Sequence, residues 1–217
     1  MNPRNVLVEF IGTFFFVLII GLVVVAPAAG VKAPGADHMA PLVIGCTLMV
    51  LVYGGGHLSG GHYNPAVTLG VFLRGKCAGA DVVPYILAQC VAAVFAGLLV
   101  NFIKGKTGTD GPPADVTKAL LVEFLFTFLL VTTVLNVATS KKTAGNSFYG
   151  LAIGFTIVVS AYAGGGISGG AYNPAIACGI TTMGLSPIGS IWVFLVPNFL
   201  AAAAAAGVYK IVNPDEA

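Results

Sequence analysis

Long apolar stretches separated by short polar segments dominate the chain. Most of them approach the roughly 20 residues that a helix needs to cross the hydrocarbon core of a bilayer. The first follows Arg4 and is too long for the apolar core of a signal peptide, so we expect it to be retained. Segments 30–38 and 105–115 carry Gly, Pro, Lys and Asp and are predicted to be loops. The pattern predicts six membrane-spanning helices, at residues 6–26, 41–55, 82–103, 117–138, 148–164 and 188–212.

Two further apolar stretches, residues 64–74 and 173–183, are too short to cross a membrane. At a rise of about 1.5 Å per residue, a helix of about eleven residues reaches roughly half of the hydrocarbon thickness. Asn is a preferred N-cap and Pro a preferred first helical residue, so Asn-Pro-Ala predicts a half-helix at each place. The motif residues are Asn64, Pro65, Ala66, Asn173, Pro174 and Ala175.

An internal repeat relates the two half-helices. Residues 59–67 match residues 168–176 at an offset of 109, with seven identities in nine positions. Upstream, Val-Glu-Phe recurs at an offset of 114. Each half therefore has three full spans and one half-helix, with repeat one at about residues 1–104 and repeat two at about 117–217. Three spans are an odd number, so the halves have opposite orientations in the membrane and together form a single domain, residues 1–217.

The inverted repeat predicts a polar path through the molecule. The half-helices approach the midplane from opposite faces, and their broken ends are tolerated only beside protein or a water-filled cavity. The Asn64 and Asn173 oxygens can cap their own helices while the amide groups still offer donors to the lumen. We expect the glycine clusters at residues 54–56, 60–61, 164–166 and 169–170 to be extended backbone whose carbonyls line the path.

Composition excludes a soluble enzyme. Hydrophobic residues make up 57% of the chain and charged residues only 8%, against about a quarter charged in an ordinary soluble domain. The net charge of +2 is scattered, so we expect no nucleic-acid partner. Six Lys and Arg residues lie on the N-terminal side of the predicted membrane and four on the other. The positive-inside rule therefore places both termini in the cytoplasm.

The segments GGHLSGGHYNPAVT and GGGISGGAYNPAI resemble the two signature loops of the aquaporin, or major intrinsic protein, family. The resemblance extends to EFIGTF in the first span, Gln89 in the third and residues 192–197 in the last. It implies an all-α membrane protein with six tilted helices, two re-entrant half-helices, a pore in each subunit and a homotetramer in the lipid bilayer. It also implies uncoupled passage of water or small neutral solutes, with no cofactor.

Glu9 and Glu123 lie within apolar runs, where an acidic residue is costly unless it faces a partner. Because the repeat relates them, we expect each to accept hydrogen bonds from the extended loop of its own half. The alternative is a proton-coupling carboxylate of a transporter. His57 and His62 flank the first loop, as histidines do in the family, and we expect them to brace it. No third ligand is near them, so no metal site is predicted.

In the family, four positions on the extracellular side of the Asn pair set selectivity, and one is an Arg directly after the second Asn-Pro-Ala. That position is Ile176 here. Spacing from the two Asn residues places the other three at Ile44, Ala161 and Gly170. The expected constriction is apolar, broad and without fixed charge. An Arg would supply donors and a positive barrier to cations, and both are missing.

These observations predict a passive channel for water and small neutral solutes of the glycerol, urea and ammonia class. One alternative is a secondary transporter, which also uses inverted repeats and broken helices. Another is a largely closed structural membrane protein of the same fold.

Overall fold

A computed structural model describes residues 2–25, 36–105, 113 and 115–216 of the chain. Helices make up most of this described part. A π-helical turn, Leu135–Thr139, continues the fifth helix, and short 3₁₀ turns lie at Lys141–Thr143, Ile188–Ser190 and Pro214–Glu216. The long helices are α1 (Pro3–Val24), α2 (Ala36–Ser59), α4 (Gly79–Lys104), α5 (Val116–Val134), α6 (Tyr149–Ser168) and α8 (Trp192–Val212). The short helices are α3 (Pro65–Leu73) and α7 (Pro174–Met183).

The predicted fold class is confirmed, because six described helices are long and apolar enough to cross a membrane. The two short helices have nine and ten residues and lie where the Asn-Pro-Ala motifs predicted half-helices. The predicted loops at 30–38 and 105–115 fall largely outside the described residues. Helix α2 is longer than expected at both ends, and it includes the whole glycine cluster at residues 54–56.

The glycine clusters at residues 54–56 and 164–166 are helical, which corrects the expectation of extended backbone. A helix keeps its backbone groups bonded within the membrane, so it continues as far as packing allows. Glycine is needed here for close approach. A Cβ at Gly55 would clash with the Tyr63 hydroxyl, and one at Gly164 would lie 2.6 Å from the Tyr172 hydroxyl. The other two glycine pairs, residues 60–61 and 169–170, lie outside the helices, in the segments between the long helices and the half-helices, and all four have a positive φ.

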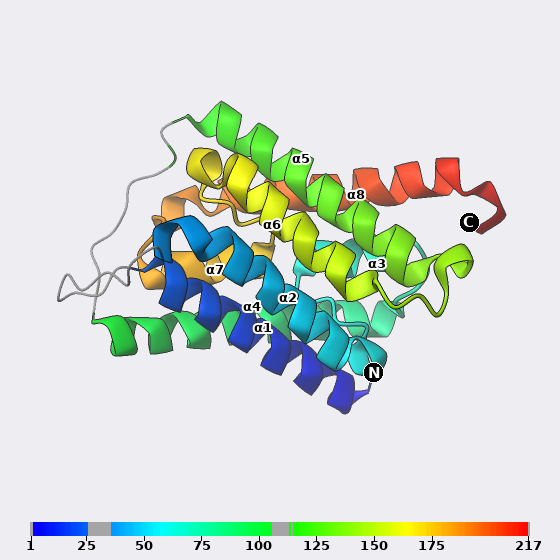
Figure 1. Ribbon diagram of the computed structural model, residues 1–217, viewed down its shortest axis with the longest axis horizontal. Coiled ribbons are helices and arrows are strands. Elements are labelled where there is room, and N and C mark those ends of the chain that lie inside the picture. The colour runs from blue at the N-terminus through cyan, green and yellow to red at the C-terminus, as the bar shows by residue number, and fades with distance from the viewer. Residues whose placement is uncertain (1, 26–35, 106–112, 114, 217) are drawn as a thin grey trace.

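Each half of the repeat forms its own group of long helices. In the first half α1 packs on α2 and α4, and in the second α5 packs on α6 and α8 (Figure 1). Helices α2 and α6 join the two groups. At their crossing, a Cβ on Gly45 would lie 2.5 Å from the Gly154 carbonyl oxygen, and a Cβ on Gly154 equally close to the Gly45 oxygen. The two backbones therefore touch, as small residues allow in membrane helices.

The half-helices are exchanged between the halves. Helix α3 of the first half packs on α8 of the second, and α7 of the second half packs on α4 of the first. Small residues permit this contact: a Cβ on Gly97 of α4 would lie 3.0 Å from the Gly179 carbonyl oxygen of α7. On α8, Ala202 and Ala205 are fully buried. Neither half can therefore form its complete packing without the other.

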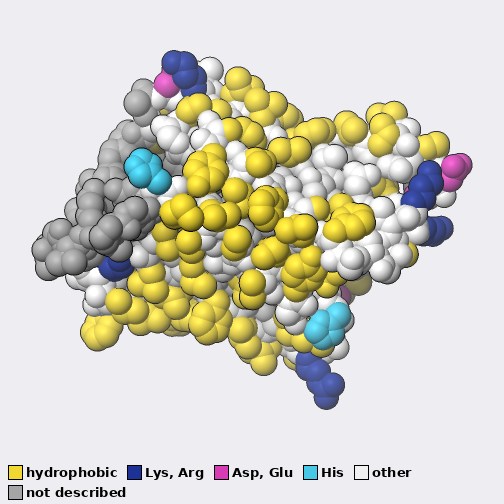
Figure 2. All heavy atoms as spheres, viewed as in Figure 1, with side chains coloured by type: hydrophobic (Ala, Val, Ile, Leu, Met, Phe, Trp, Pro, Cys, Tyr) yellow, Lys and Arg dark blue, Asp and Glu magenta, His cyan; other side chains and the backbone are white. Residues whose placement is uncertain are grey.

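The outer surface of the helices is apolar. Large hydrophobic side chains such as Leu7, Val83, Leu121 and Val159 are exposed. Figure 2 shows hydrophobic side chains across the middle of one face, while charged side chains gather toward the two ends. Exposed apolar side chains in a band are favourable only against lipid tails or protein.

A buried ion pair ties the C-terminal turn to the N-terminal side of the molecule. The Arg74 guanidinium lies 3.1 Å from the Glu216 carboxylate, and both side chains are buried. Glu216 also accepts from the Ser140 hydroxyl at 2.7 Å and the Lys141 N–H at 3.0 Å. These two donors hold the pKa of Glu216 at about 2, below its usual value of 4.5. The cluster joins the end of α3, the α5–α6 connection and the end of α8.

We expect Glu216→Gln to lower the thermal unfolding temperature of the purified protein at pH 7, because Arg74 loses its counter-ion. Lys118→Gln is the matched control, since it breaks an exposed pair with Asp115 and should change little. The stabilisation from a depressed carboxyl pKa is complete above pH 4.5 and is lost as pH falls toward about 2. The difference in unfolding temperature between Glu216→Gln and the native protein should therefore shrink to zero as the pH falls over that interval. If Glu216→Gln and the native protein unfold at the same temperature at pH 7, Glu216 does not have this role.

Candidate pore

The two Asn-Pro-Ala motifs start their half-helices as the sequence predicts. The Asn64 Oδ1 accepts from the N–H groups of Ala66 at 2.8 Å and Val67 at 3.4 Å. The Asn173 Oδ1 accepts from the Ala175 N–H at 2.9 Å. Both asparagines are almost fully buried. Each side-chain oxygen is thus used on its own helix, and only the amide nitrogen remains for other partners.

The amide nitrogens connect the two halves reciprocally. The Asn64 Nδ2 donates to the Tyr172 carbonyl oxygen at 3.0 Å, and the Asn173 Nδ2 donates to the Tyr63 carbonyl oxygen at 2.9 Å. These carbonyls belong to the extended segments that precede the opposite Asn. An amide group has two hydrogens, and the cross-link uses one of them. One hydrogen of each asparagine is left for a molecule beside the pair.

Glu9 and Glu123 hold the two extended segments through matching contacts. The Glu9 carboxylate accepts from the N–H groups of His62 at 2.9 Å and Tyr63 at 2.6 Å. Glu123 accepts from Ala171 at 2.9 Å and Tyr172 at 2.7 Å. Each also accepts from a serine hydroxyl at the end of the preceding helix, Ser59 at 2.6 Å and Ser168 at 2.7 Å. The carboxylates therefore bind the N–H groups on one side of each segment. The carbonyl oxygens of the segment remain available on its opposite side.

Two tyrosines fix the turn into each half-helix. Tyr63 and Tyr172 both have a φ of 47°, a left-handed conformation that is rare for a bulky residue. Each hydroxyl donates to a carbonyl oxygen of the preceding helix, Leu51 and Ser160, at 3.2 Å. Both rings are buried. Sequence analysis assigned the tyrosines no role, although their repetition at the same offset was a signal for one.

The two histidines of the first loop lie in different environments. His62 is buried, and its Nδ1 lies 3.1 Å from the Thr68 hydroxyl. His57 is exposed on the last turn of α2, and no hydrogen bond links it to the loop within the described residues. Of the two histidines expected to brace the loop, only His62 therefore has such a contact among the described residues, and the His57 side chain is exposed.

Sequence analysis gave no structural role to two buried amides, Gln89 and Asn198. The Gln89 Nε2 of α4 donates to Glu9 at 2.8 Å and to the Thr68 hydroxyl at 3.1 Å. In the second half, Asn198 of α8 accepts from the Thr127 hydroxyl at 2.7 Å. Gln89 and Asn198 are separated by 109 residues, the offset of the motif repeat. Two polar residues in apolar spans at that offset could have been identified from the sequence.

A wide cavity and a narrow cavity follow one another along the molecule. The wide cavity, on the side opposite the N-terminus, has a volume of about 570 Å³ and contacts α1, α2, α6, α7 and α8. The narrow cavity lies between the two asparagines and has a volume of about 10 Å³, about the space that a single water requires. Ile157 and Ile176 line both cavities. The path therefore narrows at these two side chains.

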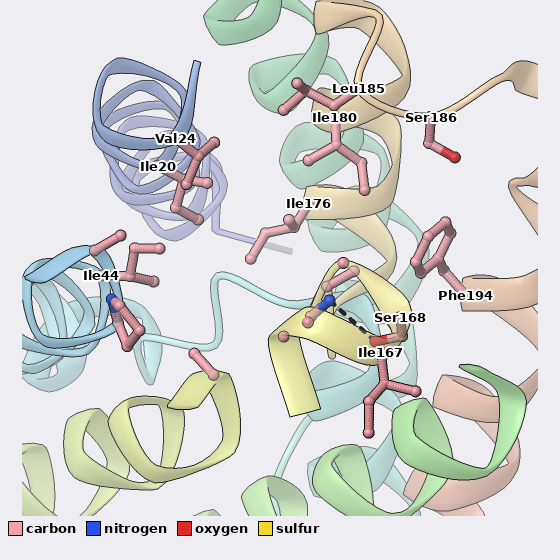
Figure 3. Close-up of a pocket in the computed structure, with 18 of the residues that line it drawn as sticks. Ile20, Val24, Ile44, Ile167, Ser168, Ile176, Ile180, Leu185, Ser186 and Phe194 are labelled. Carbon is pink, nitrogen blue, oxygen red and sulfur yellow. Dashed lines mark hydrogen bonds between the residues drawn. The ribbon is translucent and has the colours of Figure 1, made fainter. Parts of the chain in front are cut away.

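All four positions expected from the family's selectivity filter line the wide cavity: Ile44, Ala161, Gly170 and Ile176. Figure 3 shows Ile44 and Ile176 converging on the opening from α2 and α7, with Ile20 of α1 beside them. None of the described residues lining the wide cavity has a charged side chain. Nor do the described residues contain a group of three or more His, Cys, Asp or Glu side chains that could hold a metal ion.

The fold and the site define a multi-pass membrane channel: two inverted halves, exchanged half-helices, and a narrow uncharged path at their meeting point. The chain matches the major intrinsic protein family over residues 1–209 and belongs to that family. It is an integral membrane protein for passive transport of water and small solutes, and it is not an enzyme.

Curated relatives cover most of the chain. It is 34% identical to aquaporin NIP1-4 of Oryza sativa subsp. japonica, over 97% of this chain and 77% of the relative. It is 32% identical to the glycerol uptake facilitator protein-like 6 of Lactiplantibacillus plantarum, over 98% of this chain and 100% of the relative. Among solved structures, the aquaglyceroporin from Plasmodium falciparum has a similar fold, with a TM-score of 0.80. That match covers 99% of this chain and 98% of the other at 21% identity.

The carboxylate contacts predict different effects of two substitutions at Glu123. Glu123→Leu strands backbone donors at a cost of about 1–3 kcal/mol each, and should lower the unfolding temperature strongly. Glu123→Gln retains an oxygen acceptor and should lower it less. The same pair of variants at Glu9 should behave alike. Thermal unfolding of purified protein in detergent measures the effect, and native-like stability of the Leu variants at both positions would exclude bracing.

Proposed function

We propose that the chain conducts water and small neutral solutes such as glycerol, urea and ammonia through the wide cavity and past the Asn pair. The observation that carries this proposal is the uncharged path that narrows at Ile157 and Ile176 and ends on the two asparagine amides. Permeating molecules accept hydrogen bonds from Asn64 and Asn173 there. The positive ends of α3 and α7 meet at the same place and oppose cations.

Ile44, Ala161, Gly170 and Ile176 form the selectivity filter in this proposal. With Ile176 in place of an Arg, the filter is apolar, and the wide cavity that it lines, of about 570 Å³, accommodates solutes larger than water. The relatives named as a glycerol facilitator and an aquaglyceroporin are consistent with that solute class.

We further propose a homotetramer with a pore in each subunit and with both termini in the cytoplasm. An apolar groove between α1 and α2, lined by residues such as Phe15, Leu42 and Val50, offers a surface for a second copy. Within a subunit, repeat one (about 1–104) and repeat two (about 117–217) form one channel domain, residues 1–217. The exchange of half-helices between the repeats supports a single domain.

The filter assignment predicts that Ile176→Arg lowers glycerol and urea permeability relative to water and reduces any leak of cations. A guanidinium adds up to five donors and a permanent positive charge at the narrowing of the path. Stopped-flow measurements on reconstituted vesicles compare the solutes. Ile188→Arg, an identical change at an exposed residue before α8, is the control and should leave the permeabilities unchanged. Identical permeabilities in Ile176→Arg and the native protein would remove residue 176 from the filter.

The Asn pair generates a separate prediction. Asn64→Asp or Asn173→Asp removes the amide donor and places a negative charge beside the positive helix ends, so cation leak through reconstituted vesicles should rise. Asn5→Asp, in the first turn of α1 and away from both cavities, should be neutral. Unchanged solute flux and cation exclusion in both pore variants, with normal folding, would exclude the asparagines from the mechanism.

A further inference from the structure

Small residues bring α4 of the first half and α7 of the second half into close contact. A Cβ added to Gly97 of α4 would lie 3.0 Å from the Gly179 carbonyl oxygen of α7. A Cβ added to Gly179 would lie 3.7 Å from the Ala93 Cβ of α4. That separation of 3.7 Å is within the roughly 3.5–4.5 Å between the Cβ atoms of a disulfide. The two helices are therefore close enough at this crossing for a disulfide to join them.

Two cysteines occupy the same crossing, one from each half of the repeat. Cys90 lies about one turn before Ala93 on α4, and Cys178 directly precedes Gly179 on α7. The two thiols form a side-chain hydrogen bond. Both cysteines are free and partly exposed, and neither lines the wide or the narrow cavity. A bond between the two sulfurs would thus join the halves covalently without placing a side chain in the path.

Cys178 lies on the half-helix that carries the narrowing of the path. Ile176, two residues before it, lines both cavities. The narrow cavity has a volume of about 10 Å³, about the space that a single water requires. A larger solute such as glycerol therefore passes only when the side chains at this level move apart. A bond from Cys178 to α4 restricts the movement of α7, and with it the movement of Ile176.

We propose that Cys90 and Cys178 form a redox modification site whose disulfide holds α7 against α4. A hydroperoxide is the oxidant, and the bond lowers the flux of solutes larger than water. This effect on flux rests on the proposed channel function, whereas the formation of the bond does not. Cys178 is the fifth residue of α7, about 6 Å along the axis from the start of the helix inside the membrane. A neutral oxidant such as hydrogen peroxide reaches this depth more readily than a charged one.

The oxidation takes two steps. One sulfur attacks an oxygen of hydrogen peroxide, the O–O bond breaks, and the second oxygen leaves as water with the thiol proton, which produces a sulfenic acid. The other sulfur then attacks the sulfenic sulfur, the S–O bond breaks, and the hydroxyl leaves as water with the second thiol proton. The two thiols lose two electrons and the peroxide gains them. Dithiothreitol, a neutral dithiol, reverses the bond by thiol–disulfide exchange.

Thiol counting on the protein in reconstituted vesicles tests the bond. Hydrogen peroxide should remove two of the four thiols of the native protein, and dithiothreitol should restore them. Mass spectrometry should find the Cys90 and Cys178 peptides linked. Cys77→Ala, a control outside the helices, should still lose two thiols, whereas Cys90→Ala should form no linked peptide. The absence of the linked peptide from oxidised native protein, or an equal reversible loss of thiols in Cys90→Ala, would overturn the proposal.

Stopped-flow permeability before and after oxidation tests the effect on the path. Oxidation of the native protein should lower the ratio of glycerol to water permeability at least about threefold, which corresponds to roughly 0.65 kcal/mol of added barrier. Dithiothreitol should restore the ratio. Peroxide should leave the ratio unchanged in Cys90→Ala and in Cys178→Ala, two independent variants that lack the pair.

Two results would overturn the role of the bond in flux. One is an unchanged ratio in native protein whose Cys90 and Cys178 peptides are fully linked, and the other is an equal fall of the ratio in both alanine variants. Failure of the channel function has a different signature, because water and glycerol flux would then be no faster than in empty vesicles before any oxidation. The thiol count still decides in that case whether the bond forms.

Discussion

The structure depends on satisfying the backbone of two helices that begin in the middle of a membrane. No water is available there to bind unpaired backbone groups, so protein groups must do it. The reciprocal bonds from Asn64 to the Tyr172 carbonyl and from Asn173 to the Tyr63 carbonyl meet this requirement for both halves at once. Because each asparagine also caps its own helix, the two half-helices stabilise each other. Both asparagines line the narrow cavity where the half-helices meet.

The two halves hold their loops by matching contacts, whereas the residues that line the wide cavity differ between the halves. Glu9 and Glu123 bind their segments with nearly identical geometry, which keeps both sets of carbonyls turned to one side. Val67 follows the first Asn-Pro-Ala motif and Ile176 follows the second. Both side chains line the narrow cavity, but only Ile176 also lines the wide cavity. The scaffold is thus compatible with several selectivities, because Ile44, Ala161 and Ile176 line the wide cavity without taking part in the Glu9 and Glu123 contacts.

The sequence predicted the six spans and the positions of both half-helices, because apolar length and the Asn-Pro-Ala repeat depend only on local pattern. The prediction of extended backbone was wrong at the glycine clusters of residues 54–56 and 164–166. Glycine permits both extended backbone and close helix packing, and only the buried Tyr63 and Tyr172 rings show that packing prevails. The role of Gln89 also required three dimensions. Its partner Glu9 is 80 residues away in the chain, so no local pattern reveals the contact.

The central claim is that the two halves enclose a passive path through the subunit. Uptake of radiolabelled glycerol into reconstituted vesicles, followed to equilibrium with and without a proton gradient, tests it most directly. The account predicts uptake faster than in empty vesicles, ending at equal inside and outside concentrations whether or not the gradient is present. Accumulation above the outside concentration, dependent on the gradient, would contradict a passive path, and so would uptake no faster than in empty vesicles.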